Sequence, residues 1–184
     1  TILWGNRQRV AMANLTAVAY ARNERHNWLS RRRERALVKR LSAARDAYIL
    51  TLTGHDTFVD ERSPLREALK TAYEIRVMLV NPVGKGLRRH IDSLPSDITL
   101  LSYHKEIEAS IAYLAELRKA GRTITLKFYE HEPFWKVIVF GDHVWVQHCH
   151  TGFEAKHQPE YVFALQHRNP REGLYVPFYM HFLD

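Results

Sequence analysis

The sequence has a single cysteine, Cys149, and no long hydrophobic run. One thiol cannot form an internal disulfide, so we expect a cytoplasmic protein in a reducing environment. No apolar segment approaches the roughly 18 residues that a membrane span requires. The first residues, Thr1 to Trp4, lack the basic start and apolar stretch of a signal peptide. They also lack an initiator Met, so we expect a fragment of a longer protein.

Positive charge is concentrated in the first quarter of the chain. The formal net charge is +7, yet residues 1–45 carry eleven basic against two acidic residues, which is +9. Residues 46–184 carry 16 basic against 18 acidic residues, which is −2. Residues 10–21 are rich in Ala without Gly or Pro, and Ser30 is a candidate N-cap, so the first segment is predicted to be helical. We divide the chain into a basic helical arm or linker, 1–45, and an α/β domain, 46–184.

The first half of the domain has the pattern of a βαβ unit. Residues 47–53 and 75–80 indicate buried strands. Ser63-Pro64 opens a helix between them, with Pro at the first helical position. Two strands joined by a helix predict a parallel pair. A long helix is then predicted from roughly Tyr103 to Lys119, ended by Gly121.

The second half changes to short strands with few residues between them. Together with the βαβ unit they predict a mixed sheet flanked by helices, closed by a helix at 173–184. The expected strands are 123–129, 134–140, 144–148 and 161–165. The positions expected to be buried on central strands are Ile49, Leu52, Val77, Leu79, Leu126, Ile138 and Val139.

The predicted order is strand, helix, strand, long helix, strand and hairpin. Asn81-Pro82 follows the second strand, and the hairpin carries Lys136. From about residue 46 onward, this order resembles one half of the phospholipase D superfamily. The signature of that family is H-x-K-x₄-D followed by Gly-Ser. The stretch from Phe134 to Asp142 is similar to it. However, Phe134 stands where the family has its nucleophilic histidine, the spacing from Lys136 to Asp142 is one residue longer, and no Gly-Ser follows.

In the family two such motifs meet; one histidine attacks phosphorus, the other protonates the leaving oxygen, and the lysines hold the phosphate. Phenylalanine has no lone pair and no proton to give, so it does neither task. The resemblance therefore implies a non-catalytic regulatory module that recognises a phosphate-bearing ligand through Lys136, without a cofactor. Members with degraded motifs occur in bacterial regulatory and defence proteins. Single-motif chains pair across a two-fold axis, which implies a homodimer.

Two alternatives stay open at Lys136. One is a structural strand lysine whose ammonium reaches the surface, which the residue type alone favours. The other is an active phosphodiesterase of nuclease or phospholipase type, in which His148 or His150 fills the vacated catalytic role. A two-residue Gly141-Asp142 turn pairs Lys136 with Gln147 and puts both histidines on the opposite face. A three-residue loop, which the longer spacing favours, puts Lys136 and the two histidines together.

The chain has eleven histidines, and seven lie in or near the hairpin region. His148 and His150 with Glu132, Glu154 or His157 would make a zinc site, but no spacing is diagnostic. We therefore predict hydrogen-bonded structural histidines and no metal.

Acidic residues follow the first strand, where open α/β sheets bind ligands. These residues, Asp56, Asp60 and Glu61, also fit a solvated loop, and we favour that interpretation.

A run of basic residues in the arm suggests contact with nucleic acid. A helix with basic side chains on successive turns neutralises phosphates but reads no bases, so we expect weak, non-specific binding. A linking helix that pairs with an acidic neighbouring domain is an equal alternative. The residues are Arg31, Arg32, Arg33, Arg35, Lys39 and Arg40.

Overall fold

The computed structural model describes residues 20–21, 39, 44–95, 98–132, 134–149, 152, 158–171 and 173–184. Most of the predicted basic arm therefore lies outside the described residues, including every arginine of its cluster. Its residues Tyr20 and Ala21 are described and form a strand that pairs with the sheet, so the predicted helix is wrong at these two positions. Lys39 is described, and it is exposed.

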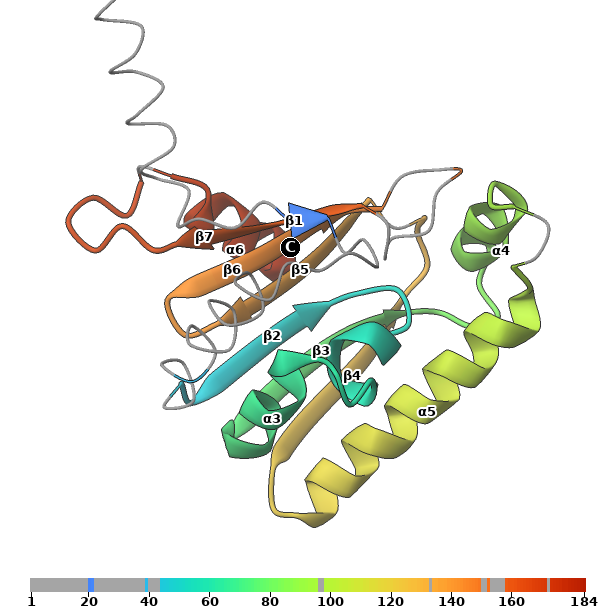
Figure 1. Ribbon diagram of the computed structural model, residues 1–184, viewed down its shortest axis with the longest axis horizontal. Helices are drawn as coiled ribbons and strands as arrows, with labels where there is room; N and C mark the ends of the chain where they lie inside the picture. Colours follow the sequence, from blue (N-terminus) through green and yellow to red (C-terminus); the bar gives the residue numbers. More distant parts are fainter. Residues whose placement is uncertain are drawn as a thin grey trace, which may run out of the picture.

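A mixed sheet organises the described chain, as the sequence predicted (Figure 1). Its strand order is β1-β7-β6-β5-β2-β3-β4. The pairs β2–β3 and β3–β4 are parallel, and all other neighbours are antiparallel. The strands are β1 (Tyr20–Ala21), β2 (Asp46–Leu50), β3 (Glu74–Val80), β4 (Thr123–Tyr129), β5 (Trp135–Phe140), β6 (His143–His148) and β7 (Pro159–Ala164).

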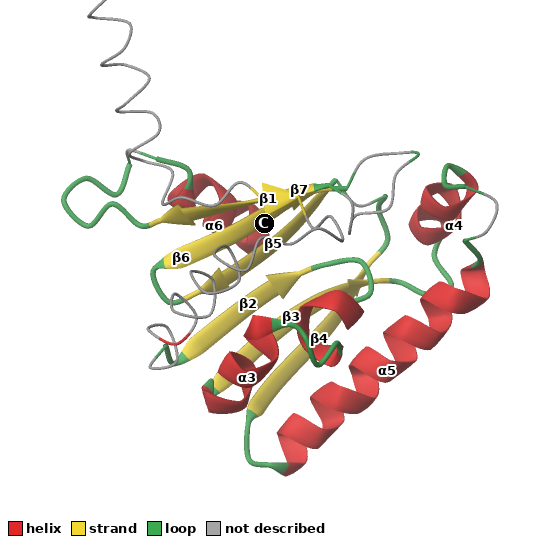
Figure 2. Ribbon diagram, in the orientation of Figure 1, coloured by secondary structure: helices red, strands yellow, loops and turns green. Residues whose placement is uncertain are grey.

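Helices flank the sheet (Figure 2). The π-helix η1 and helix α3 form the crossover between the parallel strands β2 and β3, and α5 packs against η1. Helix α4 was not expected from the sequence, because it is short and mostly polar. The bounds are η1 (His55–Val59), α3 (Pro64–Thr71), α4 (Lys85–Asp92), α5 (Leu100–Lys119) and α6 (Tyr175–Leu183).

The larger core lies between the sheet and the helices η1, α3 and α5. Ile49, Val77 and Ile138 belong to it and are almost completely buried. Of the seven positions predicted to be buried, only Leu126 is half-buried, because β4 is the last strand of the sheet on that side. Helix α3 ends at Thr71, and Tyr73, two residues beyond it, is exposed.

A second core lies on the other face of the sheet, under α6. The apolar side chains of β5, β6 and β7 there include Val137, Val146 and Phe163. Aromatic residues of α6 cover them, and Phe178 stacks on Phe163 with ring centroids 6.1 Å apart. Tyr179 packs edge-on against Tyr48 of β2. The aromatic side of the C-terminal helix therefore faces the sheet.

Within the described part of the chain, no helix combines the length and apolar character needed to cross a membrane.

Candidate functional site

The turn between β5 and β6 decides which side chains can meet. Phe140 pairs with His143, so the hairpin loop is the two-residue turn Gly141-Asp142. Gly141 has φ 60°, the left-handed conformation that two-residue hairpins need. The three-residue loop favoured from the sequence is therefore wrong, since the extra residue relative to the family motif does not enter the turn.

His148 lies on the opposite face of the sheet from Lys136. It pairs with Trp135, the neighbour of Lys136 along β5, and successive strand residues point to opposite faces. The rings of Trp135 and His148 are 5.0 Å apart and lie on the α6 side. Direct cooperation between His148 and Lys136 at one reacting atom is therefore excluded. His150 lies outside the described residues.

Three polar residues form a row across neighbouring strands on the face away from α6. Lys136 pairs with Gln147, and Gln147 pairs with Glu160. All three residues are at most 3% exposed. The interpretation of Lys136 as a lysine that extends to the surface is therefore wrong. Glu160 of this row was not predicted from the sequence, because the strand was expected to begin at residue 161. Glu160 is two positions from the buried Val162, and this strand periodicity is the signal that places it on the same face.

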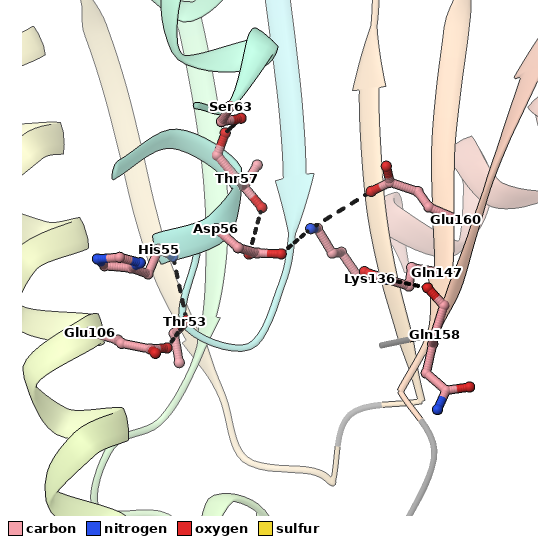
Figure 3. A network of polar contacts seen from close by, with 10 residues as sticks. All are labelled: Thr53, His55, Asp56, Thr57, Ser63, Glu106, Lys136, Gln147, Gln158 and Glu160. Atoms are coloured by element: carbon pink, nitrogen blue, oxygen red, sulfur yellow. Dashed lines mark hydrogen bonds and ion pairs between the residues drawn. The ribbon is translucent and has the colours of Figure 1, made fainter. Parts of the chain in front are cut away.

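Two carboxylates contact the Lys136 ammonium (Figure 3). Its Nζ donates a hydrogen bond to Asp56 Oδ2 at 2.8 Å, and Glu160 Oε1 lies 3.7 Å away. One cation between two carboxylates leaves this buried group with a formal charge of −1. Gln147 Nε2 donates to the carbonyl of Gln158 at 2.8 Å, whereas its Oε1 has no hydrogen-bond partner within the described structure.

Asp56 reaches Lys136 because η1 begins directly after a tight turn at Gly54. Gly54 has φ 78°, and a Cβ there would lie 2.4 Å from the ring of Phe58. The close approach of Phe58 thus requires glycine and fixes where η1 starts. Asp56 is therefore no member of a solvated loop, contrary to the expectation. Asp60 is half-buried, as Asp56 is, and Glu61 is exposed.

Further hydrogen bonds hold the loop that carries Asp56. Thr57 Oγ1 donates to Asp56 Oδ1 at 3.2 Å, so the two carboxylate oxygens have different partners. Ser63 Oγ donates to the carbonyl of Thr57. On the α5 side, Thr53 Oγ1 donates to Glu106 Oε2 at 2.7 Å. In Figure 3 the ring of His55 lies on this α5 side, away from Lys136.

The remaining candidate nucleophiles near Lys136 are not activated. Cys149 is buried, and burial raises the pKa of its thiol to about 12 although the Lys136 charge acts in the opposite direction. Burial also raises the pKa of Tyr129 well above its usual value, and the Tyr129 hydroxyl donates to the carbonyl of Thr51. Both groups are therefore protonated at neutral pH. Phe134, at the place of the family's nucleophile, is 66% exposed.

Several described histidines have structural hydrogen bonds. His143 Nδ1 lies 2.6 Å from Asp142 Oδ1, and His104 Nε2 lies 2.7 Å from the carbonyl of Pro82. His90 differs, since it is buried and neither of its ring nitrogens has a hydrogen-bond partner among the described residues. Among the described residues, no group of three or more His, Cys, Asp or Glu side chains is arranged to hold a metal ion. The proposed ligands His150, Glu154 and His157 lie outside them.

No protein-family model and no curated protein matches this chain. Among solved structures it is similar to TrmBL2, an archaeal chromatin protein whose structure shows a novel mode of DNA binding, with a TM-score of 0.44 and 10% sequence identity. The similarity covers 80% of this chain and 46% of that protein, so the chain spans less than half of its length.

Proposed function

We propose that the chain is a non-catalytic, phospholipase-D-like regulatory module that binds a phosphate-bearing ligand at Lys136. The observation that carries this proposal is the setting of Lys136: a buried ammonium at the carboxyl end of β2, with carboxylate neighbours from η1 and β7. A cation at that edge of an open α/β sheet is well placed to hold an anion.

The absence of catalysis is supported by the surroundings of the lysine. Family chemistry needs an imidazole beside the ammonium, and among the described residues His148 faces the other side of the sheet. Phe134 offers no nucleophile, and the Cys149 thiol stays protonated. A phosphodiesterase with a rearranged Lys/His site is the alternative function, and it now requires His150 alone.

Two further parts of the proposal concern partners. We expect a homodimer, because single-motif chains of the resembled family pair. We also expect the basic arm to contact nucleic acid weakly, through residues of which the structure describes only Lys39. We also expect a cytoplasmic location, because the single cysteine, Cys149, fits a reducing compartment.

Locating a bound anion tests the proposal. Crystals soaked in high concentrations of phosphate or sulfate should show an oxyanion within hydrogen-bond distance of Lys136 Nζ. Crystals of Lys136→Met serve as the control and should lack it. An anion bound elsewhere, with the Lys136 ammonium unchanged, would contradict the proposed role of this residue.

A further inference from the structure

We infer that Asp56 is an internal competitor for the anion that Lys136 binds, so that a ligand binds by displacing the Asp56 carboxylate. This inference rests on the proposed function and specifies how the same site is regulated. Asp56 Oδ2 accepts a hydrogen bond from Lys136 Nζ at 2.8 Å, the distance at which an ammonium holds a phosphate oxygen. A carboxylate of the protein thus takes the place that an anionic ligand needs.

Among the described residues around Lys136, burial differs between its two carboxylate partners. The Lys136 side chain is 3% exposed, and so is that of Glu160, whereas the side chain of Asp56 is 32% exposed. Asp56 is therefore the member of the group that meets solvent. The side of Nζ at which Asp56 meets solvent is therefore the side from which we expect a ligand oxygen to approach.

Charge leads to the same conclusion. The group of Lys136, Asp56 and Glu160 carries a formal charge of −1. An anion added to the intact group therefore meets net repulsion at short range, where few water molecules screen it. If Asp56 turns away, the local charge of Lys136 with Glu160 is zero and the repulsion falls. Exchange is thus favoured over addition.

The carboxylate can leave without unfolding its loop. Thr57 and Phe58 are completely buried, and the Phe58 ring stacks on Tyr113 of α5 at 6.0 Å, so the backbone of η1 is held in the core. Rotation of the Asp56 side chain toward water breaks the contact with Lys136 and the hydrogen bond from Thr57 Oγ1. Glu160 cannot do the same, because it is buried within the paired strand β7. Asp56 is therefore the carboxylate that a ligand displaces, and Thr57 is the residue that positions this carboxylate.

Calorimetric titration with inorganic phosphate, at an ionic strength held constant with NaCl, tests the inference on the full chain. Asp56→Asn should raise phosphate affinity by about tenfold or more, because it removes a charge-assisted competitor. Thr57→Val keeps the Asp56 carboxylate but removes the hydrogen bond from Thr57 Oγ1 to it. This variant should give a smaller rise in phosphate affinity. The matched control is Glu116→Gln, which removes the same charge from an exposed carboxylate of α5 that pairs with Lys119 and should leave affinity unchanged.

A triple variant, Asp56→Asn with Lys136→Met and Glu160→Gln, leaves the row uncharged and should lose the gain. Equal, Lys136-dependent affinity in wild type and Asp56→Asn would refute the competition and leave the proposed function standing. An equal gain in Glu116→Gln, or a gain that survives in the triple variant, would also refute it. Absence of phosphate binding in every folded variant would refute the proposed function itself. If Asp56→Asn does not fold, Thr57→Val carries the comparison, and unchanged affinity there overturns the inference.

Discussion

Lys136 lies directly opposite Gln147 across β5 and β6, and the two side chains are buried on the same face of the sheet. Residues one position along each strand, Trp135 and His148, contact each other on the other face. Because the side-chain period of a strand is two, this register separates the lysine from the histidine completely. It also aligns Lys136 with Glu160, two strands away, and so creates the charged group that Asp56 completes.

Breaking the buried ion pair should destabilise the fold. Lys136→Met leaves Glu160 buried without its cation, and we expect a loss of about 3–5 kcal/mol in the free energy of unfolding, measured by chemical denaturation. Adding Glu160→Met should recover part of that loss, since no buried charge then remains. The exposed pair Lys119–Glu116, with its 2.9 Å separation, is the control: Lys119→Met should cost less than about 1 kcal/mol. Equal losses at the two lysines would contradict this account.

Hydrolysis of bis(p-nitrophenyl) phosphate should be absent or very slow, because no imidazole or thiolate of the described residues stands beside Lys136. Release of p-nitrophenolate measures it. The proposal is wrong if the diester is turned over and both Lys136→Ala and His150→Ala abolish turnover. His148→Ala is the matched control, since that ring lies on the other face of the sheet.

Stability should fall in mildly acidic solution because of His90. Burial lowers the pKa of His90, although Glu132 acts in the opposite direction. A histidine in the unfolded chain has a pKa of about 6.5. Below that pH the unfolded chain binds a proton at His90, whereas His90 of the folded chain stays neutral until a lower pH. The contribution of His90 is therefore fully present above pH about 6.5 and is lost as pH decreases.

Thermal unfolding of His90→Phe across this pH range checks the assignment. The variant should be less sensitive to pH, and more stable at pH 6, because it also removes two buried nitrogens without partners. His181→Phe, at an exposed position of α6, should keep the wild-type pH dependence. If the unfolding temperature of His90→Phe changes with pH as steeply as that of the wild type, the pH dependence comes from other groups.

The protein should be a homodimer in light scattering. The aromatic side of α6 packs on the sheet, so the surface left for a partner on this helix is its apolar outer side, where Met180 and Leu183 are about half exposed. Replacing both by Glu should weaken a dimer formed through this surface, whereas Ile111→Glu on α5 should not. A monomer at all accessible concentrations would contradict the expectation.

The basic arm should bind nucleic acid weakly and without sequence preference. If five or six basic side chains reach phosphates, the log–log salt slope should be about −4 to −5, with binding largely lost at physiological salt. Removing residues 1–45 would also remove β1, which pairs with β7, so neutral substitutions at Arg31, Arg32 and Arg33 are the cleaner variant. Titration of duplex and single-stranded DNA at two salt concentrations measures this; tight or sequence-selective binding would contradict it.

The sequence by itself determined most of the elements. Apolar runs and breakers located β2, β3 and β4 to within a few residues, and Ser63-Pro64 and Gly121 marked helix boundaries, because these signals are local. It also determined that position 134, next to the strand that carries Lys136, holds a phenylalanine and not a histidine. It did not reveal α4, whose polar composition gives no clear apolar period.

Only the tertiary structure decided what Lys136 contacts. Its neighbours Asp56 and Glu160 are 80 and 24 positions away, respectively, and no local pattern relates residues at such separations. The turn at Gly141-Asp142 sets the face on which Lys136, Gln147 and Glu160 meet, and a slip of one residue would have brought His148 there instead. Burial of an ammonium with two carboxylates is thus a property of strand register and of the η1 crossover, which place distant charges in one poorly solvated position.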